Sequence, residues 1–412
     1  MSNLISTYKQ SYANLQPNIW ILAIAMFINR SGSMVLLFTS LYMTQQLHFS
    51  IGEVGLIMSF YGVGSVLGSY VGGWLTDRKN FFDIMIGSLI SSGLILLFIL
   101  FATTPISIGI IIFCYALAAD SFRPANGAAI TVFSTPENRT RSVSLVRMAV
   151  NLGFSVGPAI GGFIALYLGY KWLFVIDACS GFTAAAMLYI YLPKQQQEHN
   201  RKASAALQDS STSAYRDIQY LFFIFLVALY GTCFFQLFAS MPQYFNKVCN
   251  YKEDTIGLLL ALNGFLVVVI EMPLVAALER KKNIFKFIIA GTLCLPVAFS
   301  ILYFGEGKMM WALLYTLIIT MSEIFAMPFM MNYALSRPIK ERQGQYAALY
   351  SIAYGLANIA APLAGLGIAN HYGFNRMFYF FIALSSATAF GFLILHKNYK
   401  AAQLKKKLEF VP

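Results

Sequence analysis

Long apolar runs, separated by short polar turns, extend over almost the whole sequence and constrain its fold more than any other feature. A hydrocarbon layer about 30 Å thick needs roughly 20 apolar residues per helix, and twelve stretches reach this length. They cover residues 18–44, 50–76, 84–103, 106–134, 141–168, 172–193, 217–245, 255–278, 284–304, 309–336, 343–369 and 374–396. Only 11% of the residues are charged, whereas soluble proteins carry about 25%. The sequence therefore predicts an all-α membrane protein with twelve transmembrane helices.

Basic residues are distributed unevenly among the predicted turns. The two chain ends and the turns after even-numbered spans hold most of the 29 Lys and Arg residues. The opposite turns hold only Lys171, Lys247, Lys252, Lys308 and Arg376. By the positive-inside rule the more basic side is cytoplasmic, so we expect a multi-pass protein of the cell inner (plasma) membrane with both termini in the cytoplasm. The net charge of +12 thus reflects topology in a lipid bilayer, and no nucleic-acid partner is expected.

The second half of the sequence repeats the first. Matching positions are Val54 and Ile256, Gly62 and Gly264, and Asp77 and Glu279, at a shift of 202, and Pro158 and Pro362, and Gly161 and Gly365, at a shift of 204. Between the halves lies a polar, low-complexity stretch, residues 194–216, which is typical of a linker. We therefore predict two pseudo-symmetric six-helix bundles, residues 1–193 and 217–412, joined by a cytoplasmic linker, with a basic cytoplasmic tail at the C-terminal end. Two copies with the same orientation imply a pseudo-two-fold symmetry axis along the membrane normal.

Several predicted spans contain ionisable side chains in their interior: Arg30, Asp120, Arg123, Arg147, Glu271 and Glu323. Charged groups at this depth are costly and usually functional. A buried carboxyl can exchange a proton, so Asp120, Glu271 and Glu323 are the proton-coupling candidates. Asp120 and Arg123 are three residues apart and can share a helix face. A pair that only stabilises the bundle and a pair that lines a central cavity both remain open.

Polar and aromatic residues of the spans are the substrate-binding candidates. They are Asn29, Arg30, Arg123, Arg147, Tyr230, Phe234, Gln236, Phe329, Asn332 and Tyr333. An aromatic stripe on a helix is more often packing than a binding site. The five cysteines are scattered and the four histidines form no cluster, so neither a disulfide framework, a metal site nor a cofactor is expected.

Glycines at every fourth position allow close helix packing in two of the spans. Gly64, Gly68 and Gly72 precede the charged residues Asp77 and Arg78. In the fifth span, Gly153, Gly157 and Gly161 surround Pro158, which removes a mid-helix hydrogen bond. Such a surface can pack and hinge, so these residues are candidates for conformational gating.

These residues resemble motifs of the major facilitator superfamily. The loop Gly73-Trp-Leu-Thr-Asp77-Arg78-Lys79-Asn80 is similar to the family's G-x-L-a-D-r-x-G-r-k-x signature and departs from it at Asn80 and in the two phenylalanines that follow. Arg123 resembles the arginine of the span 4 signature. Residues 153–162 closely resemble the g-x-x-x-G-P-x-x-G-G signature of drug/proton antiporters. Residues 30–34 resemble the first span of a prokaryotic multidrug-like branch of the family.

The resemblance implies rocker-switch alternating access, with spans 1, 4, 7 and 10 lining the cavity. Asp77 lies just past a helix end, and we expect it to pair with a span 11 terminus or a neighbouring arginine and to hold the inner side closed.

The leading functional hypothesis is a monomeric, proton-coupled exporter of small amphipathic or multidrug-like compounds. The alternative is proton-coupled import or exchange of an anionic or zwitterionic metabolite, with Arg30 and Arg123 binding a carboxylate or phosphate. An enzyme or an ATP-driven pump is not expected, because the sequence contains no HExxH, GxSxG or P-loop motif.

Overall fold

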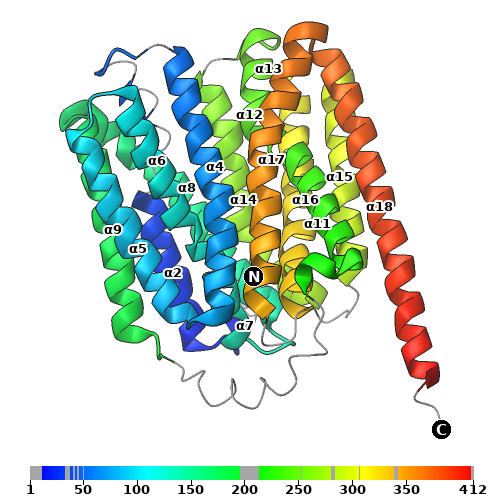
Figure 1. The fold of residues 1–412 in the computed structure, drawn as a ribbon. Coiled ribbons are helices and arrows are strands. Elements are labelled where there is room, and N and C mark those ends of the chain that lie inside the picture. Colours follow the sequence, from blue (N-terminus) through cyan, green and yellow to red (C-terminus); the bar gives the residue numbers. More distant parts are fainter. Residues whose placement is uncertain are drawn as a thin grey trace, which may run out of the picture.

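The computed structural model describes residues 12–409 except 33–37, 40–41, 44–45, 50, 195–212, 252, 280–283, 306 and 338–341. The described residues form helices and no strand (Figure 1). The N-terminal half contains α2 (Pro17–Gly32), α4 (Ile51–Arg78), α5 (Phe81–Leu97), η1 (Phe98–Phe101), α6 (Pro105–Asp120), α7 (Phe122–Val132), α8 (Arg139–Tyr167) and α9 (Tyr170–Tyr191). The C-terminal half contains η2 (Ala214–Arg216), α11 (Ile218–Phe234), α12 (Gln236–Ala239), α13 (Met241–Lys247), α14 (Glu253–Glu279), α15 (Ile284–Phe304), α16 (Met309–Ser336), α17 (Gln343–Tyr372) and α18 (Phe374–Glu409).

Every predicted span is occupied by helix in the part of the chain that the structure describes. Ten of the helices are long and apolar enough to cross a membrane, so this is a multi-pass, all-α membrane protein. The other two spans are α2, whose predicted second half lies largely outside the described residues, and α8, which carries Arg147 and Asn151 near its middle. The predicted linker also lies mostly outside the described residues.

Two of the predicted spans are interrupted, and two of the three breaks lie close to a proline. The fourth predicted span divides into α6 and α7 at Ser121, three residues before Pro124, which has no N–H to donate to the Asp120 carbonyl. The seventh divides at Phe235 and again at Ser240, just before Pro242. The predicted spans treated both stretches as continuous.

The last membrane span ends close to the predicted residue 396, because the apolar stretch covers Phe374–Lys397, but the helix itself extends further. Helix α18 continues to Glu409 because the Ala-, Lys- and Leu-rich segment after the span contains no glycine or proline and favours helix.

The internal repeat is visible in the backbone at one turn. Gly169, between α8 and α9, has φ 91° and ψ 161°, and Gly373, between α17 and α18, has φ 82° and ψ 163°. Both lie in a region that only glycine adopts without strain, and they are 204 positions apart. The same turn therefore joins the fifth span to the sixth in each half.

Buried apolar residues follow the division of the sequence. One large core is formed only by residues from Ala214 onward, and a second one by the N-terminal half alone, around Tyr42 and Phe174. A third core belongs mainly to the N-terminal half but includes Met272, Leu335 and Ala347 from the other half. The main packing across the halves is that of α4 on α17 and of α8 on α14.

The turns define two ends of the molecule. The Asp77 end is where α4, α7, α14 and α16 finish, and it includes the C-terminal end of α18 at the bottom of Figure 1. The Gly169 end, at the top of Figure 1, is where α9, α14, α16 and α18 begin.

Candidate functional site

An arginine of one half lies between two glutamates of the other. Arg147 of α8 donates from Nε to Glu271 Oε1 of α14 at 3.2 Å and from Nη2 to Glu323 Oε1 of α16 at 3.0 Å. Glu271 is fully buried, and Glu323 is 5% exposed. The sequence proposed all three residues independently, and the structure brings them together across the interface of the halves.

Two asparagines hold the second glutamate in place. Asn263 Nδ2 donates to Glu323 Oε2 at 3.3 Å and to Thr320 Oγ1 at 3.0 Å, and Asn151 Nδ2 donates to Glu323 Oε1 at 3.4 Å. We call Arg147, Asn151, Asn263, Glu271 and Glu323 the Arg147 cluster. Sequence reasoning missed both asparagines as part of it, although amides inside apolar helices were a usable signal.

The Arg147 cluster contains two carboxyls for one guanidinium. If both carboxyls were ionised, a negative charge would remain in a buried site, which is unfavourable in a low-dielectric environment. The cluster therefore favours either a proton on one carboxyl or a second cation nearby. Tyr350 and Tyr354 of α17 lie within electrostatic range of Arg147, and their rings are 5.2 Å apart. These tyrosines supply an aromatic surface beside the charges that the sequence did not predict.

A second polar cluster lies inside the N-terminal half. Arg123 Nε of α7 is 2.6 Å from Asp120 Oδ1 of α6, so this pair is formed, and the Arg123 side chain remains 32% exposed. The Arg30 guanidinium of α2 lies over the Phe154 ring at 5.6 Å. Asn29, next to Arg30 in α2, is half-buried.

Two carboxylates join the halves at the Asp77 end. Asp77, at the end of α4, accepts hydrogen bonds from the backbone N–H groups of Gly344 at 2.7 Å and Gln345 at 3.1 Å, at the start of α17. This is the span 11 terminus at which the sequence placed it. Helix N-termini bind anions because their first N–H groups have no partner within the helix.

The second carboxylate is the repeat counterpart of the first. Glu279, at the end of α14, accepts a hydrogen bond from the Thr140 backbone N–H at 3.0 Å and one from Arg141 Nε at 2.8 Å, at the start of α8. Thr140 and Gly344 are 204 positions apart, as the repeat requires. We call the Asp77 and Glu279 contacts the paired latches. They are related by the internal pseudo-symmetry and cross the interface in opposite directions.

Further contacts close the same end. Asn332 Nδ2 of α16 donates to Thr140 Oγ1 at 2.7 Å, and a Cβ added at Gly344 would collide with the Gly73 carbonyl oxygen of α4. Arg78 does not cross the interface and instead lies 3.9 Å over the Trp74 ring.

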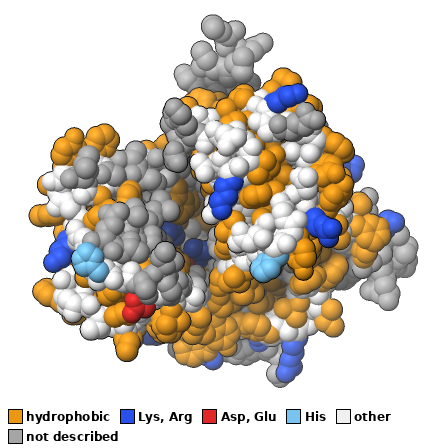
Figure 2. All heavy atoms as spheres, turned by 90° about the horizontal axis from the view of Figure 1, so that it is seen from above, with side chains coloured by type: hydrophobic (Ala, Val, Ile, Leu, Met, Phe, Trp, Pro, Cys, Tyr) orange, Lys and Arg blue, Asp and Glu red, His pale blue; other side chains and the backbone are white. Residues whose placement is uncertain are grey.

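The Gly169 end is different, because Figure 2 shows a hollow between the halves there, with basic side chains in its depth.

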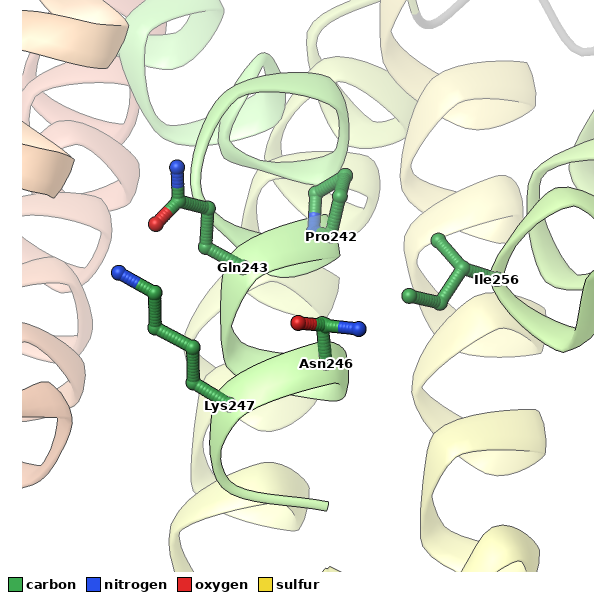
Figure 3. Close-up of a pocket in the computed structure, with 5 residues that line it drawn as sticks. All are labelled: Pro242, Gln243, Asn246, Lys247 and Ile256. Atoms are coloured by element: carbon green, nitrogen blue, oxygen red, sulfur yellow. The ribbon is translucent and has the colours of Figure 1, made fainter. Parts of the chain in front are cut away.

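A separate pocket lies at the Gly169 end of the C-terminal half, between α13 and α14 (Figure 3). It has a volume of about 350 Å³ and is lined by Pro242, Gln243, Asn246, Lys247 and Ile256. None of the predicted site residues lines it.

Several predicted substrate residues are engaged elsewhere in the C-terminal half. Gln236 is fully buried, and its amide donates to the Thr232 and Ala361 carbonyls at 3.0 and 2.8 Å. Phe329 is 1% exposed and packs on Phe287 at 4.8 Å. In this conformation neither side chain presents an unoccupied surface to a ligand.

Tyr333 and Asn332 lie toward the Asp77 end, away from the Arg147 cluster. The Tyr333 hydroxyl accepts a hydrogen bond from Arg337 Nη1 at 2.7 Å, and Asn332 bonds Thr140 as described above. Tyr230 is fully buried and bonds the Ser322 carbonyl at 3.2 Å, and Phe234 stacks on Tyr230 at 6.3 Å. Both support α16 near Glu323.

The predicted gating glycines of span 5 pack inside the N-terminal half. A Cβ on Gly153 would lie 2.7 Å from Arg30 Cβ, and one on Gly157 would lie 2.9 Å from the Ser31 carbonyl oxygen. These glycines therefore allow α8 to approach α2, and the position of Arg30 depends on that contact. Gly161 is buried in α8. Pro158 lies in the same helix, and its side chain is outside the described residues.

Residues 20–362 match the family described as Major Facilitator Superfamily. The chain belongs to the major facilitator superfamily. It is therefore a membrane transporter, and its described helices have the major facilitator fold.

Relatives in this superfamily resemble the chain over different lengths. An uncharacterized MFS-type transporter of Bacillus subtilis (strain 168), YttB, is 24% identical over 398 residues, covering 94% of this chain and 97% of its own length. Multidrug resistance protein MdtG of Escherichia fergusonii is 30% identical over 153 residues, covering 36% of this chain and 37% of its own length.

Two solved transporter structures share the fold at low identity. The human organic anion transporter MFSD10 has a TM-score of 0.74 and 14% identity, covering 92% of this chain and 100% of its own length. A bacterial homologue of the iron transporter ferroportin, in an outward-facing state, has a TM-score of 0.74 and 13% identity over 93% of this chain and 100% of its own length.

Proposed function

We propose that this major facilitator transporter exports small amphipathic or multidrug-like compounds in exchange for protons, by alternating access. The observation that carries the proposal is the Arg147 cluster, where two buried carboxyls of one half share a single guanidinium of the other. A proton or a cationic substrate group can neutralise the excess negative charge, and binding of one opposes binding of the other. This competition is the requirement for antiport.

The aromatic surroundings of the cluster suit an amphipathic cation. Tyr354 is half-buried, and its ring lies 6.0 Å from that of Phe235. Aromatic faces attract cations and cover apolar groups at the same time. Several multidrug resistance proteins among the relatives agree with this substrate class. We propose that Phe235, Tyr350 and Tyr354 contribute the apolar part of the binding surface.

The paired latches supply the gate. With both termini in the cytoplasm of a monomer in the inner membrane, as proposed from the charge distribution, the Asp77 end is cytoplasmic and the structure is outward-facing. The latches then keep the cytoplasmic side closed while the hollow at the Gly169 end is open to the outside.

The test is transport in proteoliposomes under an imposed pH gradient, with ethidium as a lipophilic cationic probe. Glu271→Gln or Glu323→Gln should abolish pH-driven ethidium movement but leave ethidium exchange without a gradient. Asp120→Asn tests the remaining candidate carboxyl, and Asp83→Asn is the control, because Asp83 pairs with Lys194 at the surface. If all three variants of the candidate carboxyls retain full coupling to the gradient, the mechanism is wrong.

A second substrate class is favoured by the basic side chains visible inside the hollow (Figure 2). Arg30 and Arg123 would bind the carboxylate or phosphate of a metabolite, which the transporter would import or exchange. Competition of ethidium binding by p-aminohippurate, but not by tetraphenylphosphonium, would support this class and contradict the first.

A further inference from the structure

A buried aspartate inside the N-terminal half has no part in the mechanism described so far. Asp177 of α9 is 5% exposed. Among the described residues, the one hydrogen bond to its carboxyl group comes from the Tyr115 hydroxyl of α6, at 3.4 Å from Oδ2. No cationic nitrogen of a described residue lies within 4.0 Å of its oxygens.

Charged and titratable groups from several helices surround Asp177. Those within electrostatic range of it, or of its neighbour Tyr61, are Arg30 of α2, Tyr61 of α4, Tyr115 and Asp120 of α6, and Arg123 of α7. Helix α5 also packs against α9, and its one charged residue, Asp83, pairs with Lys194. Of the arginines in α8, Arg141 and Arg147 bond Glu279, Glu271 and Glu323. Of the two arginines and two aspartates around Tyr61, Arg123 and Asp120 form an ion pair with each other, so Arg30 is the cation that would balance an ionised Asp177.

The partner geometry disfavours an ionised Asp177. Hydrogen bonds from a hydroxyl to a carboxylate are normally about 2.5–2.7 Å long, so the 3.4 Å contact from Tyr115 stabilises the ionised form weakly. A buried carboxylate without a close cation and without short hydrogen bonds is costly, and a protonated carboxyl avoids that cost. The Ser180 hydroxyl, on the next helical turn, donates to the Asp177 backbone carbonyl and not to its carboxyl group.

We propose that Asp177 is a second proton-binding site of this transporter, within the N-terminal half and separate from the Arg147 cluster. The ligand is a proton taken from the hollow. Tyr61 and Tyr115 each lie within electrostatic range of both Asp177 and Asp120. Asp120 Oδ2 is buried without a hydrogen-bond partner, and the Arg123 side chain is 32% exposed. This polar series connects the buried carboxyl to a group that solvent reaches.

The proposal goes beyond the Arg147 cluster, because it assigns one proton-binding site to each half. Loss of a proton from Asp177 leaves a carboxylate that attracts the nearby Arg30. Arg30 is in turn fixed by the close approach of Gly153 in α8. Proton exchange in the N-terminal half is therefore linked to the helix that carries Arg147.

The test is infrared difference spectroscopy of the purified full-length protein in lipid, titrated with protons alone and without any substrate. A protonated carboxyl has a C=O stretching band that disappears on ionisation. We expect Asp177→Asn to remove one component of this pH-dependent band and Glu271→Gln to leave that component in place. Tyr115→Phe removes the weak hydrogen bond to the ionised form, so the same component should titrate at higher pH, with a proton affinity about two- to threefold greater.

Folding of each variant is checked by its melting temperature in the same lipid. Asp83→Asn, a surface carboxyl variant, should give the wild-type spectrum. If Asp177→Asn retains the complete wild-type band, or if Tyr115→Phe leaves its titration unchanged, the proposal is overturned. Should Asp177→Asn fail to fold, the Tyr115→Phe titration decides alone. Because no substrate is present, this result is independent of the transport test on Glu271 and Glu323.

Discussion

Neutralising the paired latches should open the Asp77 end. Asp77→Asn keeps the shape of the side chain and one acceptor oxygen but removes the charge that faces two N–H groups of α17. Hydrogen bonds to charged groups contribute about 1.5–3 kcal/mol, and a charge at a helix terminus about 0.3–1 kcal/mol. Since Asn still accepts one bond, we expect a loss of about 1–2 kcal/mol from the closed form. Each 1.4 kcal/mol is a factor of ten, so the closed population should fall about 5- to 30-fold relative to the open one.

Glu279→Gln is the matched perturbation of the second latch. Its carboxylate receives one backbone and one guanidinium hydrogen bond, so we expect a similar loss. The two latches share no bonding partner, so the effects should add in the double variant. Asp83→Asn is the control, because its surface pair with Lys194 lies within the N-terminal half.

Spin labels measure the result directly. Labels at Lys79 and Arg216, which are exposed at the Asp77 end, should show a longer distance in both single variants and the longest in the double variant. Labels at Phe101 and Met310, exposed at the Gly169 end, should move closer together as that end closes. A distance distribution in the double variant that is the same as in the wild type would refute the latch argument.

Three more variants test other parts of the structure. Gly344→Ala should weaken the closed form at least as much as Asp77→Asn, because the new methyl group collides with the Gly73 carbonyl; the same spin labels report it. Arg147→Gln should destabilise the folded protein by about 3–5 kcal/mol at neutral pH, and by less at acidic pH where the two unpaired carboxyls become protonated, which thermal melting at two pH values measures. Asp217→Asn should lower stability by about 1–2 kcal/mol at neutral pH, with the difference disappearing in acid, as melting curves against pH would show.

The sign of the Asp217 prediction follows from its surroundings. Burial raises the pKa of Asp217, but hydrogen bonds from Arg337 at 2.7 and 2.8 Å and from the Tyr220 N–H at 3.0 Å outweigh it and hold the pKa below its ordinary value. A carboxyl whose pKa is lower in the folded protein stabilises the fold at pH values above its pKa in the unfolded chain. This stabilisation is lost as the pH falls through its pKa in the folded protein. A destabilisation that persisted in strong acid would contradict this account.

The fold could be predicted because its determinants are local. Apolar length specifies the spans, and the repeated positions specify two bundles. The contact between Asp77 and the start of α17 was also accessible, since a carboxylate just past a helix end needs donors and a helix N-terminus provides them.

The details of the site could not be predicted with the same success. A helix that is apolar all round gives no periodic signal of which face meets which neighbour, so Gln236 and Phe329 could not be separated from residues beside Arg147. Asp177 was detectable as a lone acid in an apolar span, but its partner Tyr115 lies 62 positions away, and only the fold brings the two together.

The helix pair α8 and α14 carries both the charge cluster and one latch. On α8, Arg141 bonds Glu279 and Arg147 bonds Glu271; on α14, Glu271 and Glu279 are about 12 Å apart at 1.5 Å per residue. A change of protonation at Glu271 therefore alters one of the two ion pairs that connect α8 and α14. If the Arg147–Glu271 ion pair is weakened, the Arg141–Glu279 contact alone resists a tilt of one half relative to the other. On the proposed mechanism, proton binding and gate opening would both act through this single helix pair, and no longer route between them would be needed.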